Sequence, residues 1–194
     1  RRGSQFTLSA QFTPPYSLFS KKDYKSLYES SSRADREELY RWIEYYKIKF
    51  KSRVYTPLNN SEKYTLVLMG RADFGLLGSY NKYKQTPFET FHVGGDGMTG
   101  SYTYATETIG LRGYDNGALT PYSDGRAYTR FSMELHFPFL LQPSSTIYGL
   151  AFVEGGNAWT SLENFNPFSL KRSAGVGVRI FLPMIGLMGI DWAY

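Results

Sequence analysis

A strict two-residue alternation between apolar and polar side chains is the feature that most restricts how this chain can fold. In residues 5–13 one face carries glutamine, serine and threonine, and the other carries Phe6, Leu8, Ala10 and Phe12. Successive side chains of a β-strand point to opposite faces, so the pattern predicts a strand with one apolar and one polar side. Pro14 and Pro15 then end the strand, because proline donates no backbone hydrogen bond.

Similar segments follow along the chain, and we predict eight strands: 5–13, 45–55, 64–76, 88–94, 128–139, 146–154, 172–182 and 186–194. The segment 146–154 is apolar on both faces, so its sequence does not show which face points to lipid and which points to the lumen. Most of these strands are about nine to twelve residues long. Strands of globular proteins average about 5–6 residues, whereas a membrane-spanning strand needs about 9–11. The lengths therefore favour strands that cross a membrane.

The composition agrees with an all-β chain, because aromatic residues make up 18% of it and it contains 19 glycines. Tyrosine and tryptophan recur near the predicted strand ends, as an interfacial girdle requires. With no cysteine and 2 histidines, we expect no disulfide, no metal cluster and no cofactor. No apolar run is long enough for a transmembrane helix. No signal peptide is visible at Arg1, which indicates an excised piece or a mature fragment.

Two connections are long. Residues 14–41 form an insert that is rich in serine and lysine, and Ser32 followed by Asp35 resembles a capping box. We expect this insert to be a flexible connector that ends in about two helical turns. Residues 95–127 form a long loop, whereas the runs 56–63, 140–145 and 183–185 are short. Long loops on one rim and short turns on the other are typical of outer-membrane barrels, and the insert is an exception to that pattern.

The long loop contains the segment Gly110-Leu-Arg-Gly-Tyr-Asp115, in which two glycines permit backbone angles that other residues avoid. Between them, Arg112 carries a planar, permanently charged fork that pairs best with carboxylate or phosphate. Two carboxylates follow, Glu134 on the polar face of 128–139 and Glu154 at the end of 146–154. Adjacent antiparallel strands would bring both to one place inside a barrel, where Arg112 would bridge them. The alternative is an arginine in a surface turn and two solvated carboxylates.

Basic side chains share the polar faces of two predicted strands, and they are Lys47, Lys49, Lys51, Arg53 and Arg71. Inside a barrel they would face the lumen, and one interpretation is an anion-selective, porin-like channel. The net charge of +5 would also suit nucleic acid. However, the basic residues alternate along strands instead of forming a patch interleaved with stacking aromatics, so we expect no nucleic-acid partner.

Several short motifs occur in a fixed order: Phe91-His-Val-Gly-Gly, the Gly110–Asp115 segment, Ser132-Met-Glu-Leu-His-Phe-Pro, Phe152-Val-Glu-Gly-Gly-Asn-Ala-Trp159, Ser173-Ala-Gly-Val-Gly-Val-Arg-Ile and Pro183-Met-Ile-Gly-Leu-Met. Together they resemble the BamA-type outer-membrane protein assembly family over essentially the whole chain. The resemblance implies that residues 1–194 are the C-terminal half of a sixteen-strand transmembrane antiparallel β-barrel, without its last strand. It also implies that the loop 95–127 folds into the lumen. Arg112, Gly113 and Tyr114 would anchor the loop there, with Glu134 and Glu154 as acceptors.

The resemblance further implies a function, which is the folding and insertion of β-barrel proteins into the outer membrane of a Gram-negative bacterium. The expected partners are outer-membrane lipids, unfolded outer-membrane protein clients and the accessory lipoproteins of the assembly (BAM) complex. No chemical step is needed, so we expect no catalytic residues and no enzyme activity. Without its first half and its periplasmic domains, this piece should not insert clients alone.

Three other functions stay open at this point. One is a sibling transporter that exports a polypeptide through the lumen, and a second is the porin-like channel. The third is a soluble β-sandwich whose apolar faces pack on each other. An enzyme would have to use Glu134, His136 and Glu154, but nothing places a nucleophile beside them. Eight strands close only into a narrow barrel, so we expect this piece to belong to a larger barrel or to associate through its edges.

Overall fold

The computed structural model describes residues 2–59, 61, 64–97, 107–120, 125–142 and 145–194. In chain order the elements are β1 (Gly3–Phe12), α1 (Tyr16–Phe19), α2 (Tyr24–Glu29), α3 (Arg33–Tyr40), β2 (Tyr46–Pro57), β3 (Val67–Gly78), β4 (Phe91–Val93), β5 (Glu107–Ile109), β6 (Ala127–Gln142), β7 (Ser145–Trp159), β8 (Lys171–Leu182) and β9 (Gly186–Ala193). The parts of the predicted long loop at 98–106 and 121–124 lie outside the described residues. None of the helices in the described ranges has the length and apolar character needed to span a membrane.

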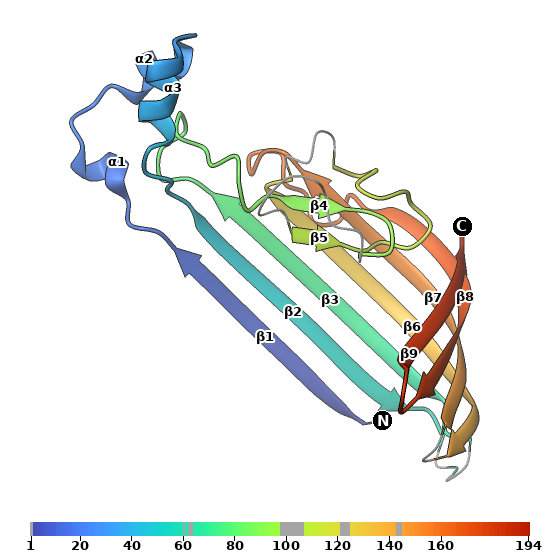
Figure 1. The fold of residues 1–194 in the computed structure, drawn as a ribbon. Helices are drawn as coiled ribbons and strands as arrows, with labels where there is room; N and C mark the ends of the chain where they lie inside the picture. Colours follow the sequence, from blue (N-terminus) through green and yellow to red (C-terminus); the bar gives the residue numbers. More distant parts are fainter. Residues whose placement is uncertain (1, 60, 62–63, 98–106, 121–124, 143–144) are drawn as a thin grey trace.

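Seven strands form one antiparallel sheet in the order β1-β2-β3-β6-β7-β8-β9, which we call the wall. Each wall strand pairs with the wall strand that follows it in the chain, so the wall is a simple meander. Figure 1 shows these long strands running side by side, with β4 and β5 lying in front of them. Long, sequentially paired antiparallel strands are the architecture of a barrel wall. The predicted fold class, a partial antiparallel β-barrel, is therefore confirmed.

The outer face of the wall is the side that carries the apolar residues of the two-residue alternation. Phe74 bridges neighbours on this face, because its ring centroid lies 6.4 Å from that of Phe50 and 5.3 Å from that of Phe131. Many of these side chains are exposed, for example Leu8 at 73% and Ile190 at 82%. In the part of the chain that the structure describes, no second layer covers this face. The apolar faces do not form the dry interior that a soluble β-sandwich requires.

The core lies on the opposite, inner face, between the wall and the loop that joins β3 to β6. Its buried cluster comprises Leu77, Phe91, Val93, Ile109 and Tyr128. The Tyr128 ring lies over Gly75 of the neighbouring strand, where a Cβ atom would come within 2.2 Å of Tyr128 Cε1. Glycine at that inward position therefore lets an aromatic ring lie flat against the wall and support the loop above it.

The prediction that 88–94 is a wall strand is wrong. Within that range, β4 pairs in parallel with β5, and the two form a separate small sheet. The wall consequently has seven strands instead of eight in the described part of the chain. The physical reason is that Phe91 and Val93 are completely buried between loop and wall, so alternation here reflects a strand packed inside the lumen. Gly94 and Gly95, with φ of 130° and 76°, turn the chain away directly afterwards.

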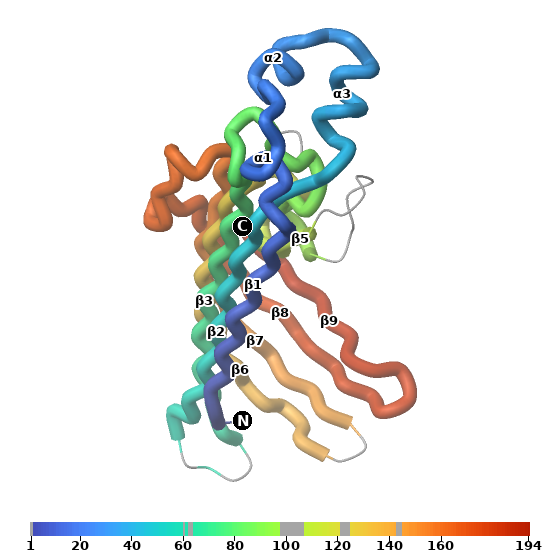
Figure 2. The backbone as a smooth tube through the Cα atoms, turned by 90° about the vertical axis from the view of Figure 1, so that its left-hand side faces the viewer, coloured from blue at the N-terminus to red at the C-terminus, as the bar shows by residue number. Residues whose placement is uncertain are grey.

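The insert 14–41 contains the three helices found among the described residues. They project beyond the ends of β1 and β2, at the same end of the wall as the long loop (Figure 1 and Figure 2). The predicted helical end of the insert is α3, which is 8 residues long. Ser32 occupies its N-cap position but makes no side-chain capping bond. Instead, the Ser30 hydroxyl donates to the Asp35 carboxylate.

Candidate functional site

The segment around Arg112 lies close against the inner face of β7 and β8. Gly113 has a φ of 87°, and a Cβ atom there would lie only 2.9 Å from the Ser173 Cβ on β8. Leu111 is completely buried, and a Cβ on Gly156 of β7 would approach its Cδ1 to 3.2 Å. Gly113 in the loop and Gly156 in β7 therefore allow the loop backbone to approach the wall closely.

Arg112 is held by carboxylates from two neighbouring wall strands. Its Nη2 donates to Glu154 Oε1 over 2.6 Å and also donates to Glu134 Oε1. Its backbone N–H donates to Glu154 Oε2 over 2.9 Å. Glu154 thus accepts hydrogen bonds from both the backbone and the guanidinium of Arg112. It therefore fixes the position of the loop backbone in addition to pairing with the charge. The structure brings together all three residues that the sequence singled out.

The surroundings of this ion cluster orient its members. Ser132 Oγ donates to Glu154 Oε1 over 3.0 Å, and His136 Nε2 lies 2.9 Å from Glu134 Oε2. The Arg112 Cζ lies 3.6 Å from the centroid of the Phe152 ring, in a cation–π contact. Burial alone would lower the pKa of the Arg112 guanidinium, but the two carboxylates outweigh it and raise that pKa above its ordinary value. The arginine therefore stays charged.

A third carboxylate, Asp191 of β9, extends the cluster towards the last strand of the chain. Its Oδ2 lies 3.6 Å from Arg112 Nη1, and a fork from Arg179 on β8 donates to both of its oxygens over 2.6 Å. Sequence reasoning assigned Asp191 no role. The signal that it missed is the register, because Asp191 pairs with Gly177 and needs the space that this glycine leaves.

A second cluster holds the start of the same segment. Arg130 Nη1 donates to the Gly110 carbonyl over 2.6 Å, and its Nη2 donates to Asp73 Oδ2 over 2.5 Å. Arg71 also donates to that Asp73 oxygen, over 2.7 Å. Arg71, predicted as a lumenal basic residue, therefore faces inward but is paired. Sequence reasoning missed Arg130 and Asp73, because only the β3–β6 register brings them together.

The predicted lysine row faces the inside of the wall and meets acidic residues of the loop. Lys49 Nζ lies 2.8 Å from Glu107 Oε2, and Lys51 Nζ lies 3.4 Å from Glu107 Oε1. Lys47 lies 3.0 Å from Glu89 and 3.3 Å from Glu107. Burial would raise the pKa of the Glu107 carboxyl, but the three ammonium groups outweigh it and lower that pKa below its ordinary value.

The remaining predicted residues take positions along the edges of these clusters. Tyr114 donates its hydroxyl to the Arg172 carbonyl over 2.8 Å, which ties the far side of the segment to β8. Arg53 pairs in register with Arg71 and adds positive charge beside it. In the described ranges, no group of three histidine, cysteine or acidic side chains is arranged to hold a metal ion. The arrangement as a whole attaches one loop to β2, β6, β7, β8 and β9 by ionic and hydrogen bonds.

Comparison with known proteins places this geometry in a family. Over its full length the chain is similar to the solved structure of BamA from Haemophilus ducreyi lacking POTRA domains 1–3, with a TM-score of 0.61 and 20% identity. The likeness covers 100% of this chain and 35% of that one, so this chain spans about a third of its length. At this identity the likeness establishes the fold. The sequence also matches the Omp85 superfamily domain over residues 1–194. The chain therefore belongs to the Omp85 superfamily, a family of outer-membrane β-barrel proteins.

Proposed function

We propose that the parent protein folds and inserts β-barrel proteins into the outer membrane of a Gram-negative bacterium, and that this chain supplies the C-terminal part of its barrel. One observation carries the proposal. Arg112, on a loop inside the wall, binds carboxylates of two neighbouring wall strands at once and lies near a third on β9. Such a contact holds β6 and β7 in register while strands farther along the wall move.

In the sheet that the structure describes, β9 is an edge strand that pairs with β8 alone. In the proposed mechanism, a seam beyond β9 offers backbone donors and acceptors to a client strand, which adds to the sheet edge.

The bilayer contributes to the same proposed mechanism, because strands that are shorter than the hydrocarbon core thin it locally. Thinned lipid beside the seam would lower the barrier for a client that enters the membrane there.

The proposed partners are outer-membrane lipids, unfolded outer-membrane protein clients and accessory lipoproteins. No chemical step and no cofactor enter this mechanism. Polypeptide export by a sibling transporter is the alternative, since it would use the same barrel. An anion-selective channel is disfavoured by a specific observation, because Lys47, Lys49 and Lys51 are paired with Glu89 and Glu107 instead of facing open lumen.

Reconstitution tests the proposal. The full-length parent is placed in liposomes, an unfolded outer-membrane barrel protein is added, and the folded client is quantified by its heat-modifiable gel mobility. The native protein should fold more client than empty liposomes, and Arg112→Ala should lose most of that gain. Arg36→Ala, an exposed arginine on α3, is the matched control and should be as active as the native protein. Client folding no faster than in empty liposomes, together with passage of polypeptide across the membrane, would favour the transporter.

A further inference from the structure

The outer face of the wall has a furrow along β7. Over the middle of β7 the outward residues are small, and from the loop end downwards they are Gly155, Val153, Ala151 and Gly149. Their neighbours on β6 are much larger, since Phe131, Met133, Leu135 and Phe137 stand directly opposite them in register. A row of small side chains beside a row of large ones leaves a channel that runs along the strand, and the Phe139 ring, which lies over Gly149, forms its lower end.

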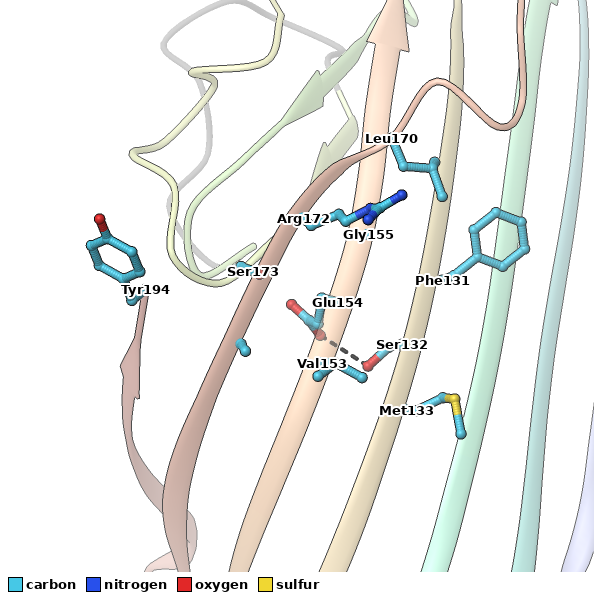
Figure 3. Close-up of a pocket in the computed structure, with 11 residues that line it drawn as sticks. Phe131, Ser132, Met133, Val153, Glu154, Gly155, Leu170, Arg172, Ser173 and Tyr194 are labelled. Carbon is cyan, nitrogen blue, oxygen red and sulfur yellow. Dashed lines mark hydrogen bonds between the residues drawn. The ribbon is translucent and has the colours of Figure 1, made fainter.

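Two hollows follow one another down this furrow. The upper one has a volume of about 520 Å³ and lies around Val153 and Gly155, and Figure 3 shows the residues that line it. The lower one has a volume of about 500 Å³ and lies around Gly149 and Ala151. Both fall within the roughly 300–1,000 Å³ range of small-molecule sites. Their linings are predominantly apolar, as a binding site for hydrocarbon requires.

The furrow has the length of one bilayer leaflet. Gly149 and Gly155 are six residues apart, or roughly 20 Å along the strand at about 3.4 Å per residue. With a strand tilt of about 45°, that distance covers roughly 15 Å of depth, which is half of the roughly 30 Å hydrocarbon core. An acyl chain of one leaflet would therefore fit along it.

A single cation marks the upper end. Arg172 of β8 pairs in register with Gly155, so its side chain belongs to the outer face. Within the described residues, it is the one charged side chain in the outward rows of the seven wall strands, and it forms no salt bridge there. Figure 3 shows it reaching across β7 above Gly155.

An arginine on the lipid-facing side is costly in the middle of a bilayer and tolerated near the interface. Arg172 is the second residue of β8, at the end of the wall that carries the long loops. Tyr194 lines the same hollow and is 94% exposed, and a tyrosine at this level is typical of the headgroup region. The charge therefore lies where lipid phosphates lie.

We propose that the furrow along β7 is a binding site for one anionic membrane lipid, with an acyl chain along Gly149–Gly155 and the phosphate on the Arg172 guanidinium. Arginine forms a planar fork that suits phosphate oxygens. The occupant is a lipid because the furrow is continuous with the exposed apolar face of the wall and has a complementary charge at the level of the headgroups. The inference needs only the outer-membrane barrel and does not depend on the proposed assembly function.

Native mass spectrometry of the full-length parent in detergent tests this site. The probes are phosphatidylglycerol, phosphatidylcholine with the same acyl chains, and inorganic phosphate alone. We expect one phosphatidylglycerol to bind more tightly than phosphatidylcholine, and phosphate alone to leave it undisplaced. Arg172→Gln should weaken phosphatidylglycerol binding by about five- to tenfold, the effect of one basic residue near an anionic lipid.

Filling the furrow provides a second, independent test. A Cβ on Gly155 would meet Leu170 at 3.4 Å and the Lys171 carbonyl at 3.7 Å, which are ordinary contacts, so Gly155→Leu should fold and block the upper hollow. Gly70, in the outward row of β3 with nothing within 4 Å of its Cβ position, gives the control Gly70→Leu. The proposal requires weaker lipid binding for Gly155→Leu and native binding for Gly70→Leu. Equal binding by all variants, or equal binding of both lipids by the native protein, would overturn it.

Discussion

Replacing Arg112 by alanine removes a side chain that joins the loop to both wall carboxylates. The side chains of Arg112, Glu134 and Glu154 are 16%, 13% and 6% exposed. Breaking a buried ion pair costs roughly 3–5 kcal/mol, because it leaves an unpaired charge behind. Here the loss should be smaller, since Glu154 keeps its bonds from the residue 112 backbone and from Ser132. We expect Arg112→Ala to lower the unfolding free energy of the full-length parent by about 2–4 kcal/mol.

A double-mutant cycle isolates the pair. Glu154→Gln keeps an acceptor for the backbone N–H but removes the charge, so it should cost about 1–3 kcal/mol. Because both changes break the same contact, the double variant should cost at least about 1 kcal/mol less than the sum of the single variants. The assay is reversible urea unfolding of the full-length parent in detergent or lipid, followed by tryptophan fluorescence and by gel mobility.

Two outcomes would refute this reasoning. Additivity within about 0.5 kcal/mol would mean that Arg112 and Glu154 do not interact. An equally large loss for Arg36→Ala, on the exposed surface of α3, would mean that the loss reflects total charge and not the cluster.

Three further predictions concern the attachment of the loop. Glu107→Gln should flatten the dependence of the unfolding free energy on pH, because the Glu107 carboxyl has a lowered pKa in the folded protein. The stability that this carboxyl contributes is fully present above its unfolded pKa of about 4.3 and is lost as the pH falls through its folded pKa. Urea midpoints between about pH 6 and pH 3 check this. Gly113→Ala should lower the unfolding free energy by about 1–3 kcal/mol, because φ is 87° and the new Cβ would meet the Ser173 Cβ at 2.9 Å. In the same urea assay, the control Gly70→Ala should have an unfolding free energy within about 0.5 kcal/mol of the native value. Asp191→Asn should loosen β9, which faster amide hydrogen exchange in residues 186–193 would reveal, and unchanged exchange would show that its ion pairs do not hold the strand.

Much of the wall could be predicted from sequence, because the physical signal is local. Phe6, Leu8 and Phe12 on one face of β1 indicate an extended backbone between lipid and lumen, and β1 is a strand on which these three side chains are exposed. Strand ends were harder to predict. Gly155 and Gly156 looked like the end of a strand, yet β7 continues to Trp159. The absent side chain of Gly156 makes room for Leu111, so that glycine marks close packing against the loop instead of a turn.

The site was partly predictable for a different reason. Arg112 stood out because glycines flank it, and the family resemblance supplied its acceptors, whereas spacing alone left a solvated arginine open. Asp73, Glu107 and Asp191 could not be assigned, because their partners are set by strand register and by a fold-back of the loop that leaves no local pattern. For the same reason, the alternation at Phe91 and Val93 predicted a wall strand, whereas the structure has a strand inside the lumen there.

The most direct test of the central claim is an experimental structure of the full-length parent in a lipid bilayer that resolves side chains at the loop. The decisive quantity is the distance between Arg112 Nη2 and Glu154 Oε1. Our account predicts about 2.6 Å, with Glu134 in contact with the same guanidinium and the outer face of β1–β9 against lipid. A separation beyond about 4 Å, the limit of an ion pair, would contradict it.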